Sequence, residues 1–179
     1  MTDSMGSKSI QILVETGLGN ILIDLYSEQA PLTVKNFLCY VDEERFLNAC
    51  FYRVVHMNNQ PDNQIKIEVI QGGLKDDEHP LSLPAILHEN TLKTGILHKD
   101  GIISMARNEP GSASSEFFIC IGDQPELDYG GKRNPDGQGF AAFGRVIEGM
   151  NVVRTIQSQP AEGQYLLEDV PILGIRRDG

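Results

Sequence analysis

A loop of small polar residues between two apolar runs is the part of the sequence best suited to hold a ligand. The apolar runs are residues 102–106 (IISMA) and 117–121 (FFICI), and the loop between them is residues 107–115 (RNEPGSASS). Two apolar strands can hold such a loop rigidly, and backbone amides without bulky side chains beside them can then face a ligand. A hairpin with a long surface turn is the alternative, and residue types alone favour it.

Arg53 is a single cation inside the apolar run of residues 49–55 (ACFYRVV). It could supply a fixed positive charge to a ligand, because a guanidinium stays charged and its donors form a rigid fork. By residue type alone, an arginine in an apolar strand lies more often on the solvent face. The pattern therefore leaves open whether Arg53 faces a ligand or the solvent.

The histidines and cysteines indicate neither a metal site nor a redox site. His79, His88 and His98 lack the i, i+4 spacing of helical metal ligands, and we expect them to be scattered surface residues. The cysteines form no CxxC pair, and we expect all of them to be buried free thiols. They are Cys39, Cys50 and Cys120. Phosphate-loop, dinucleotide-binding, serine-hydrolase and zinc-protease motifs are also absent, so no cofactor is expected.

The composition indicates one globular domain with an acidic surface. Of the 179 residues, 40% are hydrophobic and 22% are charged, which suits a buried core and argues against disorder. The formal net charge of −10 excludes nucleic acid as an expected partner, because phosphate binding needs a basic surface. We assign residues 1–9 to a flexible N-terminal segment and residues 10–179 to a single domain.

The first nine residues, MTDSMGSKS, lack the hydrophobic stretch of a signal peptide. Nowhere do about 18 apolar residues follow one another, so the sequence predicts no membrane span. We therefore expect no membrane partner and a cytoplasmic location. The periplasm is the alternative if a leader has been removed.

Apolar periodicity predicts many short strands and two helices. The strands are expected at residues 10–15, 20–25, 49–55, 67–70, 102–106, 117–121, 140–147 and 171–176. Helical spacing of apolar residues predicts one helix from Pro31 to about Glu44 and another over residues 150–156. Strands and helices do not alternate as in βαβ units. This favours a closed antiparallel barrel with helices over its ends, because closure removes exposed strand edges.

Four segments in the chain resemble the cyclophilins, the peptidyl-prolyl cis-trans isomerases. They are residues 51–55 (FYRVV), 70–73 (IQGG), 104–107 with 112–119 (SMAR and SASSEFFI) and 143–150 (FGRVIEGM). The likeness extends from about residue 10 to residue 175. The SMAR and SASSEFFI segments resemble the bacterial branch of the family. It implies a mainly β fold, a closed eight-stranded antiparallel barrel capped by two α-helices. The active groove would lie on the outer face and not in the lumen.

The resemblance places Arg53 where the family has its catalytic arginine, and Gln71 where the family has the glutamine that steadies it. The barrier to rotation about an Xaa–Pro bond is amide resonance, worth roughly 18–20 kcal/mol. A twisted bond has lost that resonance, and its nitrogen regains a lone pair. A guanidinium aimed at this nitrogen would stabilise the twisted form and not the planar one. Such chemistry needs no metal, cofactor or nucleophile.

Further groove residues follow from the same resemblance. Ala106 and Arg107 line the groove where the family has Ala-Asn, and there the backbone does the binding. Phe118 and Leu127 correspond to pocket residues that hold the proline ring.

Several pocket positions depart from the family pattern, although we still assign three of them, Val69, Glu116 and Phe140, to substrate binding. Val69 stands for the pocket methionine, and Phe140 occupies the place of a pocket histidine. Glu116 stands where many members have glutamine. Glu68 falls where a phenylalanine is common, although a bulge could place Ile67 there.

We therefore predict a peptidyl-prolyl cis-trans isomerase that assists protein folding. Its partners would be proline-containing peptides and unfolded or folding proteins, and it would be a monomer. The altered pocket positions leave an alternative, a proline-peptide binding or chaperone module with a cyclophilin fold and little turnover. A structural subunit of an assembly is a third reading, supported only by the long polar segments 56–66 and 123–139.

Overall fold

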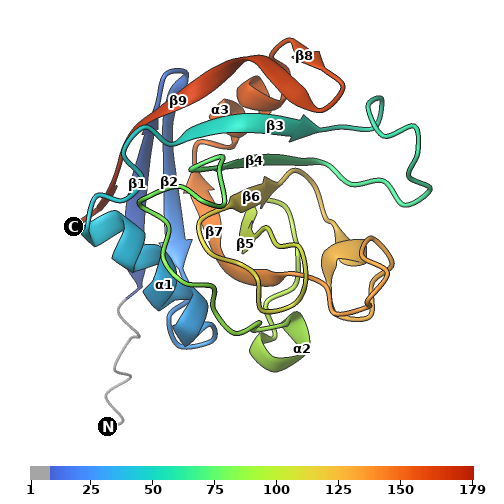
Figure 1. Cartoon of the computed structure of the whole chain (residues 1–179), viewed down its shortest axis with the longest axis horizontal. Coiled ribbons are helices and arrows are strands. Elements are labelled where there is room, and N and C mark those ends of the chain that lie inside the picture. The colour runs from blue at the N-terminus through green and yellow to red at the C-terminus, as the bar shows by residue number, and fades with distance from the viewer. Residues whose placement is uncertain (1–8) are drawn as a thin grey trace, which may run out of the picture.

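The computed structural model describes residues 9–179, which form a closed antiparallel β-barrel (Figure 1). The strands are β1 (Ile10–Thr16), β2 (Gly19–Leu25), β3 (Cys50–Val55), β4 (Val69–Gly73), β5 (Ile102–Met105), β6 (Phe117–Cys120), β7 (Ala141–Glu148), β8 (Ala161–Glu162) and β9 (Tyr165–Arg177). Eight of them follow the order β1-β2-β7-β5-β6-β4-β3-β9, and pairing of β1 with β9 closes the ring. The predicted barrel is confirmed.

Residues 1–8 lie outside the described residues. The predicted flexible segment 1–9 falls almost wholly on them. The division of the chain into that segment and a single domain over residues 10–179 therefore stays a prediction.

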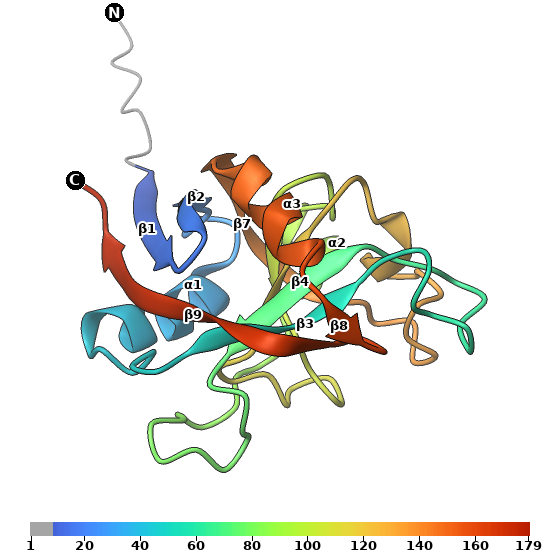
Figure 2. The ribbon, with the colours of Figure 1, turned by 90° about the horizontal axis from the view of Figure 1, so that it is seen from above.

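Apolar side chains from the strands and from two helices fill the barrel interior. The helices are α1 (Pro31–Asp42) and α3 (Met150–Gln157), which lie on different sides of the barrel (Figures 1 and 2). The ring of Phe37 on α1 packs 5.2 Å from that of Phe143 and 5.4 Å from that of Phe117. Val153 and Ile156 of α3 are fully buried. Both predicted helices are confirmed at nearly their predicted bounds.

Three elements differ from the expectation. A third helix, α2 (Thr91–Thr94), is too short to show a periodic pattern; the Asn90 side chain accepts the N–H of Lys93 at its start, and Gly95 in a left-handed conformation ends it. β9 begins at Tyr165, whereas the sequence predicted a strand from residue 171. The prediction was too short because most side chains in the first half of β9 are exposed and break the apolar pattern. Among the strands of residues 9–179, the two-residue β8 pairs with β9 alone.

Candidate active site

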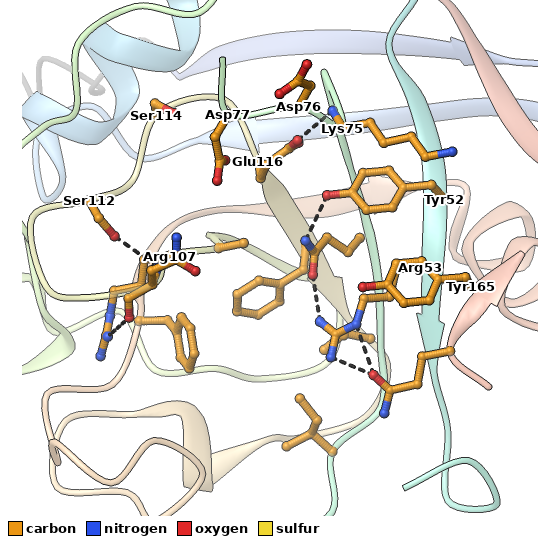
Figure 3. A pocket seen from close by; sticks show the side chains of 18 of the residues that line it. Tyr52, Arg53, Lys75, Asp76, Asp77, Arg107, Ser112, Ser114, Glu116 and Tyr165 are labelled. Carbon is orange, nitrogen blue, oxygen red and sulfur yellow. Dashed lines mark hydrogen bonds between the residues drawn. The ribbon is translucent and has the colours of Figure 1, made fainter. Parts of the chain in front are cut away.

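A cavity of about 820 Å³ opens beside β3, β4 and β6 (Figure 3). It contains all of the residues that the sequence assigned to the site. They are Arg53, Val69, Gln71, Ala106, Arg107, Glu116, Phe118, Leu127 and Phe140. The apolar residues beneath the cavity form a cluster distinct from the barrel core. The cavity therefore lies on the outer face of the barrel, as predicted, while the role of each residue remains a prediction.

Strand register brings the central residues side by side. Arg53 on β3 pairs with Gln71 on β4, and Gln71 pairs with Phe118 on β6. On its other side Arg53 pairs with Tyr165 on β9. Directly opposed residues in an antiparallel sheet have Cβ atoms about 5 Å apart and share one face. The sheet thus sets a cation, an amide and an aromatic ring in one row.

A β-bulge in β3 turns two consecutive side chains toward the cavity. The register of β3 shifts between Phe51 and Arg53 against both β4 and β9. Phe51 and Val54 consequently enter the barrel core, whereas Tyr52 and Arg53 both line the cavity. Strict alternation would have sent Phe51 and Arg53 to the same face. The bulge therefore places Arg53 in the groove, half-buried, and not at the solvent-exposed position that residue type alone favours.

Two glutamine side chains hold the Arg53 guanidinium. Nη1 donates to Oε1 of Gln71 at 2.8 Å, while Nε and Nη2 both donate to Oε1 of Gln164, at 3.0 and 2.7 Å. A guanidinium carries five N–H donors. Within the described part of the chain, one N–H on Nη1 and one on Nη2 are thus left for a ligand. Burial lowers the pKa of Arg53, but an arginine remains charged in a protein.

Both glutamines are themselves anchored. Nε2 of Gln71 donates to the hydroxyl of Tyr52 at 2.9 Å. Nε2 of Gln164 donates to the carbonyl oxygen of Asn59 at 3.2 Å, so the long loop after β3 supports the clamp on Arg53. Sequence reasoning missed Gln164, because no motif marks the stretch before β9. Only the pairing of β3 with β9 brings this side chain to Arg53.

The floor of the cavity is apolar and aromatic. Phe118, Leu127, Val69 and Ile67 are buried in one cluster beneath it. The ring of Phe140 meets that of Phe118 edge to face, with ring centroids 5.4 Å apart. A flat apolar ring of about the size of proline suits such a surface, because burial of apolar area is favourable and non-directional.

Irregular backbone before β4 brings Ile67 to this floor. The side chain of Gln60 replaces strand pairing there: its Nε2 donates to the carbonyl oxygen of Ile67 at 2.8 Å, and the N–H of Ile67 donates to its Oε1 at 3.1 Å. Ile67 lines the cavity, whereas Glu68 is not among its lining residues. Of the two alternatives left open by the sequence, the structure thus shows Ile67 in the pocket.

Comparison with known proteins shows the family. The family model described as cyclophilin type peptidyl-prolyl cis-trans isomerase/CLD matches residues 11–177. The chain belongs to the cyclophilin family. Peptidyl-prolyl cis-trans isomerase cyp18 of Streptomyces antibioticus is 34% identical to it over 162 residues, which cover 89% of this chain and 90% of that protein. Peptidyl-prolyl cis-trans isomerase B of Escherichia coli is 30% identical over 161 residues, which cover 89% and 92%. The predicted family and enzyme class are confirmed.

Solved structures agree with the fold of this cyclophilin. A cyclophilin type peptidyl-prolyl cis-trans isomerase of Cryptosporidium parvum matches it with a TM-score of 0.76 at 21% sequence identity, over 96% of this chain and 98% of that one. A structure of that protein in the presence of the dipeptide Ala-Pro matches with a TM-score of 0.75. At this level of identity the likeness supports the barrel fold alone.

His98 of this cyclophilin is buried, so the predicted surface position is wrong. Its Nδ1 lies 2.7 Å from Oδ1 of Asp128, and its Nε2 lies 2.8 Å from Oγ of Ser104. The ring also stacks on Phe118, with centroids 6.0 Å apart. Burial of a histidine is tolerated when both ring nitrogens have partners. Local spacing could not show this, because Asp128 lies 30 residues away in the chain.

The Arg107 side chain holds a loop in place and does not face the cavity as a free cation. It donates to the carbonyl oxygen of Gly139 at 2.6 Å, pairs with Asp136 at 2.9 Å and lies 4.9 Å from the ring centre of Phe140. Only 1% of this side chain is exposed. The backbone role assigned to Arg107 from the sequence stays a prediction.

Glu116 forms part of the cavity wall and is half-buried. Its Oε1 accepts the backbone N–H of Lys75 at 2.6 Å. The carboxylate occupies the space that Gly73 leaves by having no Cβ, and Gly73 has a φ of 141° that suits glycine. Burial raises the pKa of Glu116 to about 7; the Lys75 N–H opposes this shift, and the nearby charge of Asp77 adds to it. Such a group changes its charge near neutral pH.

The cysteines are free thiols, but only Cys120 is buried. Cys39 and Cys50 are partly exposed, so the prediction of three buried thiols is wrong for these two. Burial raises the pKa of Cys50 to about 11, which keeps this thiol protonated at neutral pH. Across residues 9–179, no group of three or more His, Cys, Asp or Glu side chains could hold a metal ion.

Proposed function

We propose that this cyclophilin binds proline-containing segments of peptides and folding proteins in the cavity, and that Arg53 accelerates cis–trans rotation of their Xaa–Pro bonds. One observation carries the proposal. A charged donor with two unused N–H groups is fixed in register with an aromatic floor at Phe118. The floor suits a proline ring, and the free donors suit a nitrogen that gains a lone pair.

The chemistry follows from what changes during rotation. In a planar amide the nitrogen lone pair is delocalised, and the nitrogen is a poor acceptor. At the twisted geometry the lone pair is localised and can accept a hydrogen bond from Arg53. A bond made only in the twisted state lowers the barrier and not the ground state. A barrier lower by about 4 kcal/mol corresponds to about a thousandfold in rate.

The glutamine clamp makes this donor effective. Gln71 and Gln164 hold the guanidinium in one orientation, so it need not reorganise when the bond twists. Backbone contacts to the peptide are expected at Ala106. Its N–H already donates to the carbonyl oxygen of Glu116 at 3.0 Å, so a substrate that bonds the Ala106 backbone must use its carbonyl.

Exchange NMR on a short Xaa–Pro peptide tests the proposal. The wild type should raise the cis–trans exchange rate, and Arg53→Ala should lower kcat/KM by about 100-fold, as removal of a transition-state donor does. Arg53→Lys keeps the charge but loses the fork and should not restore activity. Arg145→Ala, which removes an exposed arginine of β7 outside the cavity, is the matched control.

Two outcomes would redirect the proposal. Full activity of Arg53→Ala would dismiss the catalytic role of that residue. Peptide binding without faster exchange in the wild type would favour the alternative function, a proline-peptide binding or chaperone module with little turnover.

We also propose that the protein acts as a monomer, without a cofactor, in the cytoplasm, with the periplasm as the alternative location. Within residues 9–179, no helix is long and apolar enough to cross a membrane. Gel filtration, assay after dialysis against a chelator and cell fractionation test these three points separately.

A further inference from the structure

Four carboxylates form one side of the cavity, and we call Asp76, Asp77, Glu78 and Glu116 the acidic wall. Asp76, Asp77 and Glu78 are exposed on the turn after β4, and Glu116 lies just before β6. Figure 3 shows Asp76, Asp77 and Glu116 gathered at one end of the cavity, with Tyr52 between them and Arg53. The wall is therefore part of the same cavity as Arg53.

In the part of the chain that the structure describes, no lysine, arginine or histidine forms an ion pair with the acidic wall. Lys75 directs its ammonium to Asp169, at 2.7 Å, and over the ring of Tyr52, at 5.9 Å from its centre. Lys75 contacts the wall through its backbone N–H, which donates to Glu116, and not through its ammonium. By contrast, Asp136 beside the cavity is neutralised by Arg107. The negative charge of the wall is left to a ligand or to solvent.

Glu116 responds to this excess of negative charge. Burial is the largest cause of its raised pKa, and the charges of Asp77 and Asp76 raise the pKa further. Its Oε2 is buried and has no hydrogen-bond partner among residues 9–179. The Tyr52 hydroxyl lies near enough to lower the pKa of Glu116, but not within hydrogen-bonding geometry. A cation beside the wall would relieve this repulsion.

The opposite side of the cavity is positive. Arg53 is bonded to neutral glutamines, and Arg133 donates to Oε1 of Gln60 at 2.9 Å and to the carbonyl oxygen of Ile65 at 2.6 Å. Burial lowers the pKa of Arg133, and the nearby charge of Arg53 lowers it further. The cavity therefore has a negative side and a positive side, and such a field discriminates between ligands by their charge.

We propose that the acidic wall makes this enzyme select proline-containing segments that carry a lysine or arginine within three residues of the proline. The inference rests on the proposed function, because the prolyl bond must lie against Arg53 in the same cavity. A long flexible cation can reach the wall while the proline ring lies on the apolar floor. An acidic side chain at the same position would be repelled.

A matched peptide series tests this selection by exchange NMR. Each peptide has one Xaa–Pro bond in a neutral sequence, with a single lysine or glutamate at one of the three positions on either side of the proline. At about 20 mM salt, kcat/KM should be about five- to tenfold higher for lysine than for glutamate at the best position. The ratio should approach one at about 0.5 M salt, where the charges are screened.

Two double variants separate the wall from the overall charge. Asp76→Asn with Asp77→Asn should bring the ratio of lysine to glutamate peptides close to one. Glu28→Gln with Glu148→Gln removes two exposed carboxylates outside the cavity and should leave the ratio as in the wild type.

Each other outcome has a distinct meaning. If all peptides are isomerised equally well, the inference is overturned and the proposed function stands. A ratio that survives in the asparagine variant, or that is lost equally in the glutamine control, also overturns it, because the net charge of the protein would then explain the preference. If no peptide is isomerised, the proposed function itself fails.

Discussion

Replacing Gln164 with alanine should slow catalysis while leaving substrate binding nearly unchanged. The change removes the oxygen that accepts two of the three hydrogen bonds holding Arg53, at 3.0 and 2.7 Å, and leaves the third to Gln71. Hydrogen bonds to charged groups are worth about 1.5–3 kcal/mol each, but Arg53 is only half-buried and water can replace part of the loss. We therefore expect a loss of about 1.5 kcal/mol, which is about tenfold in kcat.

The KM for a proline peptide should change by less than about twofold, because the apolar floor at Phe118 and Leu127 is untouched. Exchange NMR over a range of peptide concentrations gives kcat and KM separately. Gln164→Glu keeps an acceptor oxygen in place and should retain most of the activity. Within residues 9–179, the Gln159 side chain donates only to the carbonyl oxygen of Thr155, at the end of α3, so Gln159→Ala should match the wild type.

Two results would refute this reasoning. One is an unchanged kcat in Gln164→Ala. The other is an equal loss in Gln164→Ala and Gln164→Glu, since a glutamate oxygen should still position Arg53.

Three further predictions concern residues around the cavity. Glu116→Gln should raise the free energy of unfolding at pH 8, by at most about 3 kcal/mol. Urea unfolding should show this gain vanish as the pH falls from about 7 to the ordinary pKa of 4.5, because between these values the native state of the wild type binds a proton that the unfolded state lacks. A gain independent of pH would contradict the raised pKa of Glu116. Gly73→Ala should cost about 3 kcal/mol in the same assay, because a Cβ there would overlap the Glu116 carboxylate and lie 2.8 Å from a backbone oxygen, whereas Gly174→Ala, with open space around it, should be nearly neutral. Arg107→Met should cost about 2–3 kcal/mol and speed amide hydrogen exchange in residues 123–139; unchanged exchange there would exclude the structural role.

Local sequence patterns determined most of the fold, and the resemblance to the family located nine of the residues that line the cavity. Alternation of apolar residues marked the strands of the barrel, and helical spacing marked α1 and α3, because these signals depend only on neighbours within a few positions. Family motifs then located Arg53, Gln71 and Phe118, which the structure brings together. Where the local pattern was weak, as in four-residue α2 and the exposed first half of β9, the prediction missed or shortened the element.

Only the tertiary structure decided how the site works. The bulge in β3 turns Arg53 outward, and the pairing of β3 with β9 delivers Gln164 to it across 111 residues of chain. Partners distant in sequence likewise bury His98, and the niche at Gly73 raises the pKa of Glu116. Register, burial and long-range partners are properties of the assembled sheet, because a shift of one residue in pairing would send the same side chains to the opposite face.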